Sequence, residues 1–171
     1  MRKFYLMFLL AFLVNLSGYA QIQRHFFDFT LGVTPENEVV KYFKAKGKQI
    51  EKHNDDSYFV HNLRFGGNTW PFAAFSFHKG VLYLVYFSDG ENYNLKERQD
   101  ILWRRLKEDI TKKYSTYYMS SLSDEEELTF SDYRTRIRLS YKPYNDIMGV
   151  TLIYSDKNLQ LEKIYSESDE L

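Results

Sequence analysis

The chain of 171 residues contains no cysteine. This absence excludes disulfide bonds, and it also excludes the acylated cysteine that would anchor a bacterial lipoprotein. The fold must therefore be stabilised by its hydrophobic core alone, and about 150 residues are enough for such a core. Because small secreted eukaryotic domains are often rich in disulfides, an exported chain without them favours a bacterial envelope as its location.

An excess of charge of either sign is also missing, since 23 basic residues balance 23 acidic residues. Proteins that bind nucleic acid nonspecifically, or that adhere to anionic lipid, usually carry a clear basic excess. We therefore expect no nucleic-acid partner. What the chain has in abundance is aromatic residues, which make up 18% of it.

The sequence lacks the common motifs of catalysis, phosphate binding and metal binding. It contains no G-x-S-x-G, H-E-x-x-H or P-loop pattern, and none of its four histidines lies four residues from another. We therefore expect no catalytic residue, no cofactor and no metal. The acidic run of residues 124–127 leaves one alternative open, a catalytic carboxylate pair, against the interpretation as a solvated loop.

The first twenty residues have the pattern of a signal peptide. Arg2 and Lys3 precede an apolar run at residues 4–14, and small residues stand at Gly18 and Ala20. We predict cleavage after Ala20, which leaves a periplasmic or secreted protein without a stable membrane anchor. The competing interpretation is a retained anchor, although the apolar run is short for a membrane span.

Two helices and a helical tail are predicted. In "VTPENEVVKYFKAKG", Thr34 is a natural N-cap, Pro35 fits the first helical position, and Gly47 fits the end of the helix. Asn94 and Glu97 form a capping-box pattern at the start of a longer helix, which carries an apolar stripe that ends at Tyr114. The tail, residues 157–171, has a shorter helical pattern.

Six strands are predicted at residues 58–65, 69–77, 81–88, 127–131, 134–142 and 149–156. The segment "GVLYLVYFSD" before the second helix resembles "GVTLIYSD" near the end of the chain. The order of elements therefore predicts one α+β domain at residues 21–171, built of two tandem α-β-β-β units at about 31–90 and 94–156. We expect an antiparallel sheet with the helices packed on one face.

The stretch "LGVTPENEVVKYFKAKG", together with the order of elements, resembles the β-lactamase-inhibitor-protein-like superfamily and small outer-membrane assembly lipoproteins of bacteria. These proteins are tandem helix-plus-sheet repeats. The resemblance implies protein binding and no chemistry. The chain departs from the pattern because it has no lipobox cysteine and because each unit shows one helix, where that superfamily often has two.

Two surfaces are candidates for binding. In "RTRIRLSY", alternation places Arg134, Arg136 and Arg138 on the open face of the sheet, either to grip carboxylate or phosphate groups of a partner or to pair with Glu127. The strands "TWPFAAFSF" and "VLYLVYFS" are apolar on both faces, so one face needs a cover or a partner. Of the two alternating sets we expect the outward one to hold these four residues: Trp70, Phe72, Tyr83 and Phe87.

These patterns predict an exported, non-enzymatic binding module whose aromatic and arginine residues recognise a protein or another envelope ligand. Two alternatives stay open. One is a small envelope hydrolase that uses carboxylates, and the other is a structural envelope protein that self-associates through its open face.

Overall fold

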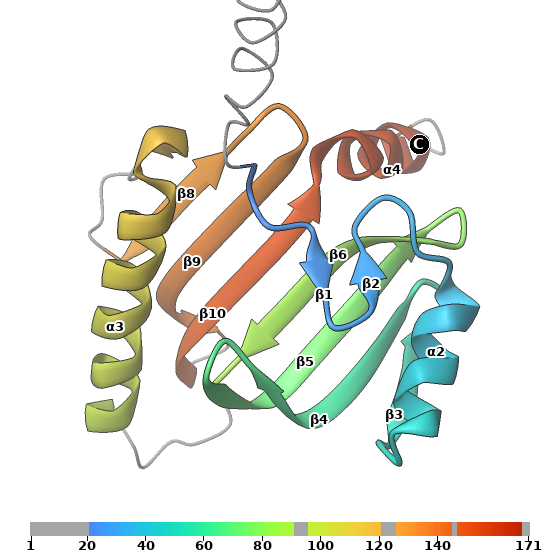
Figure 1. Cartoon of the computed structure of the whole chain (residues 1–171), viewed down its shortest axis with the longest axis horizontal. Helices are drawn as coiled ribbons and strands as arrows, with labels where there is room; N and C mark the ends of the chain where they lie inside the picture. The colour runs from blue at the N-terminus through green and yellow to red at the C-terminus, as the bar shows by residue number, and fades with distance from the viewer. Residues whose placement is uncertain (1–20, 91–95, 121–125, 145–146, 169–171) are drawn as a thin grey trace, which may run out of the picture.

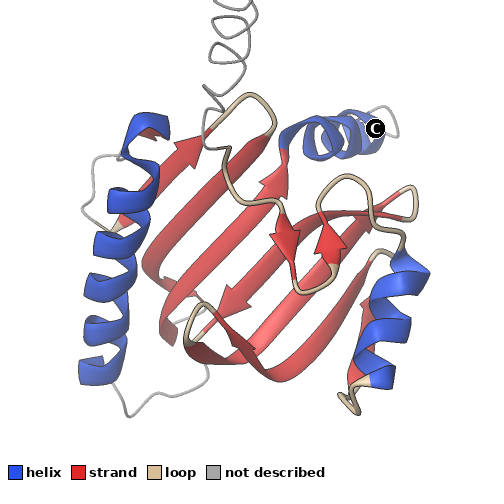
Figure 2. Cartoon of the chain, viewed as in Figure 1, coloured by secondary structure: helices blue, strands red, loops and turns tan. Residues whose placement is uncertain are grey.

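A computed structural model of the chain describes residues 21–90, 96–120, 126–144 and 147–168 (Figure 1). The described residues form one eight-stranded antiparallel sheet in the order β3-β4-β5-β6-β10-β9-β8-β7, a two-stranded ribbon, and three α-helices. Helices α2, α3 and α4 lie at the borders of the sheet, and the ribbon lies over its middle (Figure 2). The predicted α+β class is confirmed.

The elements follow one another as two similar series. The ribbon comes first, with β1 at His25–Phe26 and β2 at Phe29–Thr30. The first series is α2 (Glu36–Ala45), β3 (Ile50–Asn54), β4 (Ser57–Phe65), β5 (Asn68–His78) and β6 (Val81–Ser88). The second series is α3 (Lys96–Tyr114), a 3₁₀ turn (Ser115–Tyr117), β7 (Tyr118–Ser120), β8 (Glu127–Ser131), β9 (Thr135–Tyr144) and β10 (Ile147–Asp156), and α4 (Lys157–Ser168) ends the fold.

Each series has one strand more than predicted. The additional strands, β3 and β7, are the outermost strands of the sheet. Four of the five residues of β3 are exposed, and β7 has only three residues. An edge strand needs neither an apolar face nor length to complete a ladder. For this reason hydrophobic alternation did not reveal these two strands.

The two strands with similar sequences lie side by side at the centre of the sheet. Strand β6 pairs with β10 in antiparallel register, with Ser88 opposite Thr151 and Tyr86 opposite Ile153. The sheet is therefore two four-stranded meanders that meet at this central pair.

One face of the sheet is covered by α2, α3 and the β1–β2 ribbon. The side chains beneath them form a continuous core in which Phe26, Phe75, Phe87 and Phe130 are fully buried. Burial of an aromatic side chain of this size contributes about 2–3 kcal/mol each, before the cost of ordering it. Helix α4 instead crosses the ends of β10, β6 and β5.

The start of α2 differs from the prediction. The Thr34 hydroxyl accepts the Thr30 N–H at 2.8 Å, so it stabilises the preceding turn, and Pro35 occupies the N-cap without a side-chain hydrogen bond. A side-chain cap is found at α4, where Asp156 Oδ1 accepts the backbone N–H groups of Asn158 and Leu159, each at 3.1 Å.

Candidate binding site

A groove of about 700 Å³ lies on the sheet face opposite α2 and α3. Leu152 and Tyr154 of β10 face the core under α3, so Thr151 and Ile153, which alternate with them, face the other way and line the groove. The groove crosses the sheet from β3 to β8. Its lining residues are His53, Ser57, Phe59, Phe72, Ala74, Ser76, Leu84, Tyr86, Glu127, Arg138, Ser140, Thr151 and Ile153.

The strand register places the groove residues in rows that run across the sheet. One row runs through paired residues in the order Arg138, Ile153, Tyr86, Ala74 and Phe59. Four steps between neighbouring strands span about 19 Å. A partner segment of that length would therefore contact an arginine at one end and an aromatic cluster at the other.

The aromatic end of the groove is a contact cluster from four strands. Phe59 and Phe72 meet edge to face with ring centroids 4.4 Å apart, and Tyr86 lies 6.2 Å from Phe72. His53 stacks on Phe59 at 4.2 Å, and His61 lies 5.7 Å from Phe72. Phe59, Phe72 and Tyr86 are half-buried, so each keeps part of its ring area available to a partner.

The polar end of the groove carries cationic and hydroxyl groups. Arg138 and its neighbour on the same face, Arg136, are both exposed. The Ser140 and Thr151 hydroxyl oxygens lie 2.6 Å apart and hydrogen-bond each other. Guanidinium groups in this setting suit carboxylate or phosphate oxygens. Glu127 is the one carboxylate among the described lining residues, whereas a glycosidase needs a pair.

The three predicted arginines have different surroundings. Arg138 lines the groove. Arg136 pairs in register with Ser131 and lies beside the groove. Arg134 sits in the turn before β9, where its Nε is 3.4 Å from Asp156 Oδ2. The three arginines therefore differ: Arg138 lines the groove, Arg136 is exposed on the same face of β9, and Arg134 pairs with Asp156.

Of the four predicted aromatic residues, Phe72 faces the groove and the other three do not. Trp70 is 1% exposed and donates its indole N–H to the Phe65 carbonyl oxygen at 3.1 Å, beneath α3. The prediction that Trp70 and Phe72 share a face was wrong. Strict alternation fails next to an irregularity of β4. Asn62 has a φ of 51°, and its neighbours His61 and Leu63 pair with Phe72 and Trp70.

Tyr83 and Phe87 were also predicted outward and are buried. Phe87 is fully buried in the core, and the alternate residue Tyr86 is the one that lines the groove. Tyr83 is 9% exposed and lies at a bulge where the register between β5 and β6 shifts. Burial raises the pKa of Tyr83, and charged residues of α4, which contacts β6, are among the groups that act on it.

Sequence reasoning missed Phe59, Tyr86 and His53 as groove residues. Tyr86 belongs to the alternating set that was assigned inward, together with Leu84. Phe59 carried a usable signal, because it shares a strand face with the polar residues Ser57 and His61 on the part of β4 before the interruption at Asn62.

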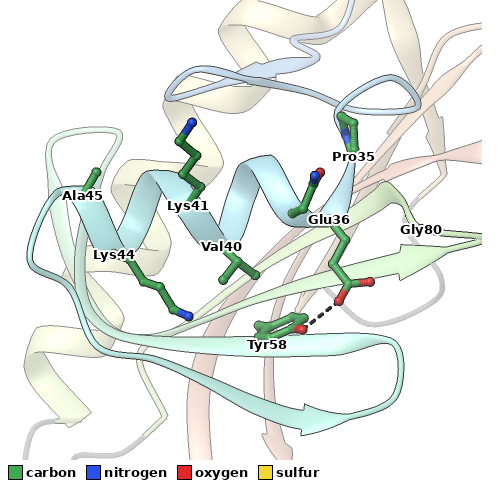
Figure 3. Close-up of a pocket in the computed structure, with 9 residues that line it drawn as sticks. Pro35, Glu36, Val40, Lys41, Lys44, Ala45, Tyr58 and Gly80 are labelled. Carbon is green, nitrogen blue, oxygen red and sulfur yellow. Dashed lines mark hydrogen bonds between the residues drawn. The ribbon is translucent and has the colours of Figure 1, made fainter.

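A second depression, of about 870 Å³, lies between α2 and β4. In Figure 3, Val40 and Lys44 extend from α2 toward Tyr58, while Lys41 points away from it. The Tyr58 hydroxyl donates a hydrogen bond to Glu36 Oε1 at 2.7 Å, and this bond, with smaller effects of burial and of the Glu36 charge, raises the pKa of Tyr58. This hydrogen bond connects α2 to β4.

Comparison of the chain with protein-family models, with curated proteins and with solved structures finds no significant match. In the described ranges, no helix has the length and apolar character needed to cross a membrane. Nor do the described residues include three or more histidine or acidic side chains grouped to hold a metal ion.

Proposed function

We propose that the chain is an exported, non-enzymatic binding module and that the groove on its open sheet face recognises a partner protein. The observation that carries this proposal is a cross-strand row that holds the exposed Arg138 and two half-buried residues of the aromatic cluster, Tyr86 and Phe59. Aromatic residues and arginine are the residue types that most often dominate the energetics of protein interfaces.

The chemistry of the groove specifies the kind of segment that would fit. The cluster of Phe59, Phe72 and Tyr86 offers apolar area to an apolar or aromatic side chain. Arg138 and Arg136 offer bidentate hydrogen bonds to a carboxylate. A segment that presents an apolar residue and an acidic residue about 19 Å apart would satisfy both ends at once.

The proposal is tested with the mature chain, residues 21–171, as bait for binding in an envelope extract. Two groove variants, Phe72→Ala and Arg138→Glu, are compared with two matched variants outside the groove, Tyr133→Ala and Arg104→Glu, whose parent residues are exposed. We expect each groove variant to weaken capture of the partner about tenfold or more, as hot-spot residues do. The matched variants should bind like the parent.

Equal capture by groove and control variants would overturn the proposal. The two alternatives make different predictions for the same proteins. A hydrolase would turn over glycan or peptide polymers and lose that turnover in Glu127→Gln. A self-associating protein would change its sedimentation with concentration and lose this dependence in Phe72→Ala.

A further inference from the structure

A smaller cleft of about 210 Å³ lies on the opposite side of the sheet, between α3 and the strands beneath it. We call it the α3 cleft. Both series of elements contribute to its walls. The aromatic and aliphatic lining residues are Phe65, Trp70, Leu106, Ile110, Tyr114, Leu152 and Tyr154.

The mouth of the α3 cleft is polar. Asp109 and Lys113 reach it from α3, and Gln23 reaches it from the segment before β1. Lys113 Nζ lies 3.4 Å from Gln23 Oε1. Because one acidic and one basic side chain stand at the mouth, their charges offset each other, and the entrance does not favour an ion of either sign.

The hydroxyl groups of two tyrosines line the interior. The Tyr114 hydroxyl oxygen accepts the Gln23 N–H at 3.4 Å. Tyr154 is 4% exposed, and within the described part of the chain its hydroxyl forms no hydrogen bond. In that part of the chain, His78 Nε2 is the one side-chain nitrogen or oxygen that is fully enclosed and has no hydrogen-bond partner. The Tyr154 hydroxyl also has no partner, so it is not fully enclosed and must keep some accessible surface. The α3 cleft is the accessible space that this side chain lines. Burial, with a smaller effect of Tyr114, raises the pKa of Tyr154, so the hydroxyl stays protonated and able to donate.

We propose that the α3 cleft binds a small, neutral, single-ring aromatic molecule that carries one hydrogen-bonding group, and that the Tyr154 hydroxyl bonds to that group. The size supports this class, because a cavity of about 150 Å³ is enough for benzene. The walls support it too, since Phe65, Trp70 and Tyr154 supply aromatic surfaces for edge-to-face or stacked contact. This site is independent of the groove, which lies on the other face of the sheet.

Trp70 provides a built-in reporter for the test. The chain has two tryptophans, and Trp103 stacks on Tyr141 rather than lining the cleft. A Trp103→Phe protein, residues 21–171, retains Trp70 alone. Its fluorescence and its NMR shifts are followed during titration with p-cresol, and with toluene as the probe that lacks the hydroxyl. We expect saturable binding of both probes, with p-cresol bound about fivefold more tightly, as one added hydrogen bond allows.

Two variants distinguish binding in the α3 cleft from the contribution of the Tyr154 hydroxyl. Tyr154→Phe should keep toluene binding and lose the preference for p-cresol. Ile110→Phe fills the cleft and should abolish the binding of both probes, whereas Ile101→Phe, on the exposed side of the same helix, should bind like the parent. Leu106→Phe replaces Ile110→Phe if the latter does not fold, as judged by its thermal transition.

The outcomes decide the proposal in both directions. Absence of a saturable signal for either probe in the folded parent protein overturns it. So does unchanged binding in a folded cleft-filling variant, because the probes would then sit elsewhere. A preference for p-cresol that survives in Tyr154→Phe overturns the assigned role of the hydroxyl.

Discussion

Arg24 Nη2 lies 2.6 Å from Asp156 Oδ2, and the contact joins the start of the fold to the end of its last strand. Both side chains are largely buried, with 10% of Arg24 and 2% of Asp156 exposed. Arg24 also donates to the Thr135 hydroxyl oxygen at 2.9 Å. Three separate segments of the chain therefore meet at one ion pair.

The first prediction concerns this pair and pH. Burial alone would raise the pKa of Asp156, but the hydrogen bonds from Arg24 and the Leu159 N–H, with the charges of Arg24 and Arg134, lower it below its ordinary value. A carboxyl group with a lowered folded-state pKa stabilises the fold above its unfolded pKa of about 3.9, and this stability is lost as the pH falls through the folded value.

Asp156→Asn should therefore lower the free energy of unfolding at pH 7 by about 3–5 kcal/mol, because Arg24 is left buried without its partner. It should also weaken the dependence of stability on pH below about 4. Urea unfolding between pH 7 and pH 2 measures both effects. Asp55→Asn, at a fully exposed carboxylate, is the control and should follow the parent protein. A parent-like pH profile in Asp156→Asn would contradict the assignment.

The second prediction concerns Trp70, which sequence reasoning placed on the surface. Because the side chain is buried under α3 and its indole N–H is bonded to the Phe65 carbonyl, Trp70→Ala should cost about 3–5 kcal/mol of unfolding free energy. Tyr133→Ala, at an aromatic residue that is 70% exposed, should change stability by less than about 0.5 kcal/mol. Similar losses in the two variants would show that Trp70 is not a core residue.

The third prediction separates the two glycines of the repeated segments. Gly80 has a φ of 73° and open space around it, so Gly80→Ala should cost about 1–2 kcal/mol through backbone strain, and Gly80→Asn should cost less. A Cβ at Gly149 would lie 2.8 Å from the Gly90 Cα. Both Gly149→Ala and Gly149→Asn should therefore destabilise through overpacking, by about 1–3 kcal/mol. Chemical denaturation of the four variants tests whether asparagine rescues only the first position.

The fourth prediction concerns the hydrogen bond between Tyr58 of β4 and Glu36 of α2. Glu36→Ala removes the hydrogen bond that raises the pKa of Tyr58, so this pKa should fall toward its ordinary value of about 10. NMR of ring-labelled tyrosine between pH 8 and pH 12.5 follows the change. Tyr141, whose pKa is raised to about 12 by burial and by its hydrogen bond to Asp100, should not respond. A Tyr58 pKa that stays raised would mean that Glu36 is not its cause.

The fifth prediction concerns export. Mass spectrometry of the protein recovered from a bacterial envelope should find Gln21 as the first residue. Replacement of Ala20 by a bulky residue should block processing, because signal peptidase requires a small side chain there. Recovery of an intact Met1 on membrane-bound material would contradict the prediction.

Hydrophobic pattern located the interior strands and helices because each of them buries at least one face. Residues 81–88 and 127–131 match β6 and β8 at both ends. Hydrophobic pattern did not reveal β3, because four of its five residues are exposed and polar. It also could not show which face of a doubly apolar strand is inward, since both alternating sets of β5 and β6 satisfy the same rule.

The candidate site was predicted in part for the same reason. Arg138 was placed correctly because β9 alternates strictly between arginine and apolar residues. Phe72 was placed correctly but grouped with Trp70, because strict alternation was applied across Pro71, and a proline inside a strand signals an irregularity. The bulge at Tyr83 is a property of two strands together, and neither strand alone reveals it.

Strand β10 is the last strand in the chain and yet it lies at the centre of the sheet. Until β10 has been synthesised, β6 has no neighbour on its inner side, and the first meander cannot join the second. Long-range pairing of this kind delays folding until nearly the whole polypeptide is present. The topology therefore couples completion of the sheet to synthesis of its C-terminal strand.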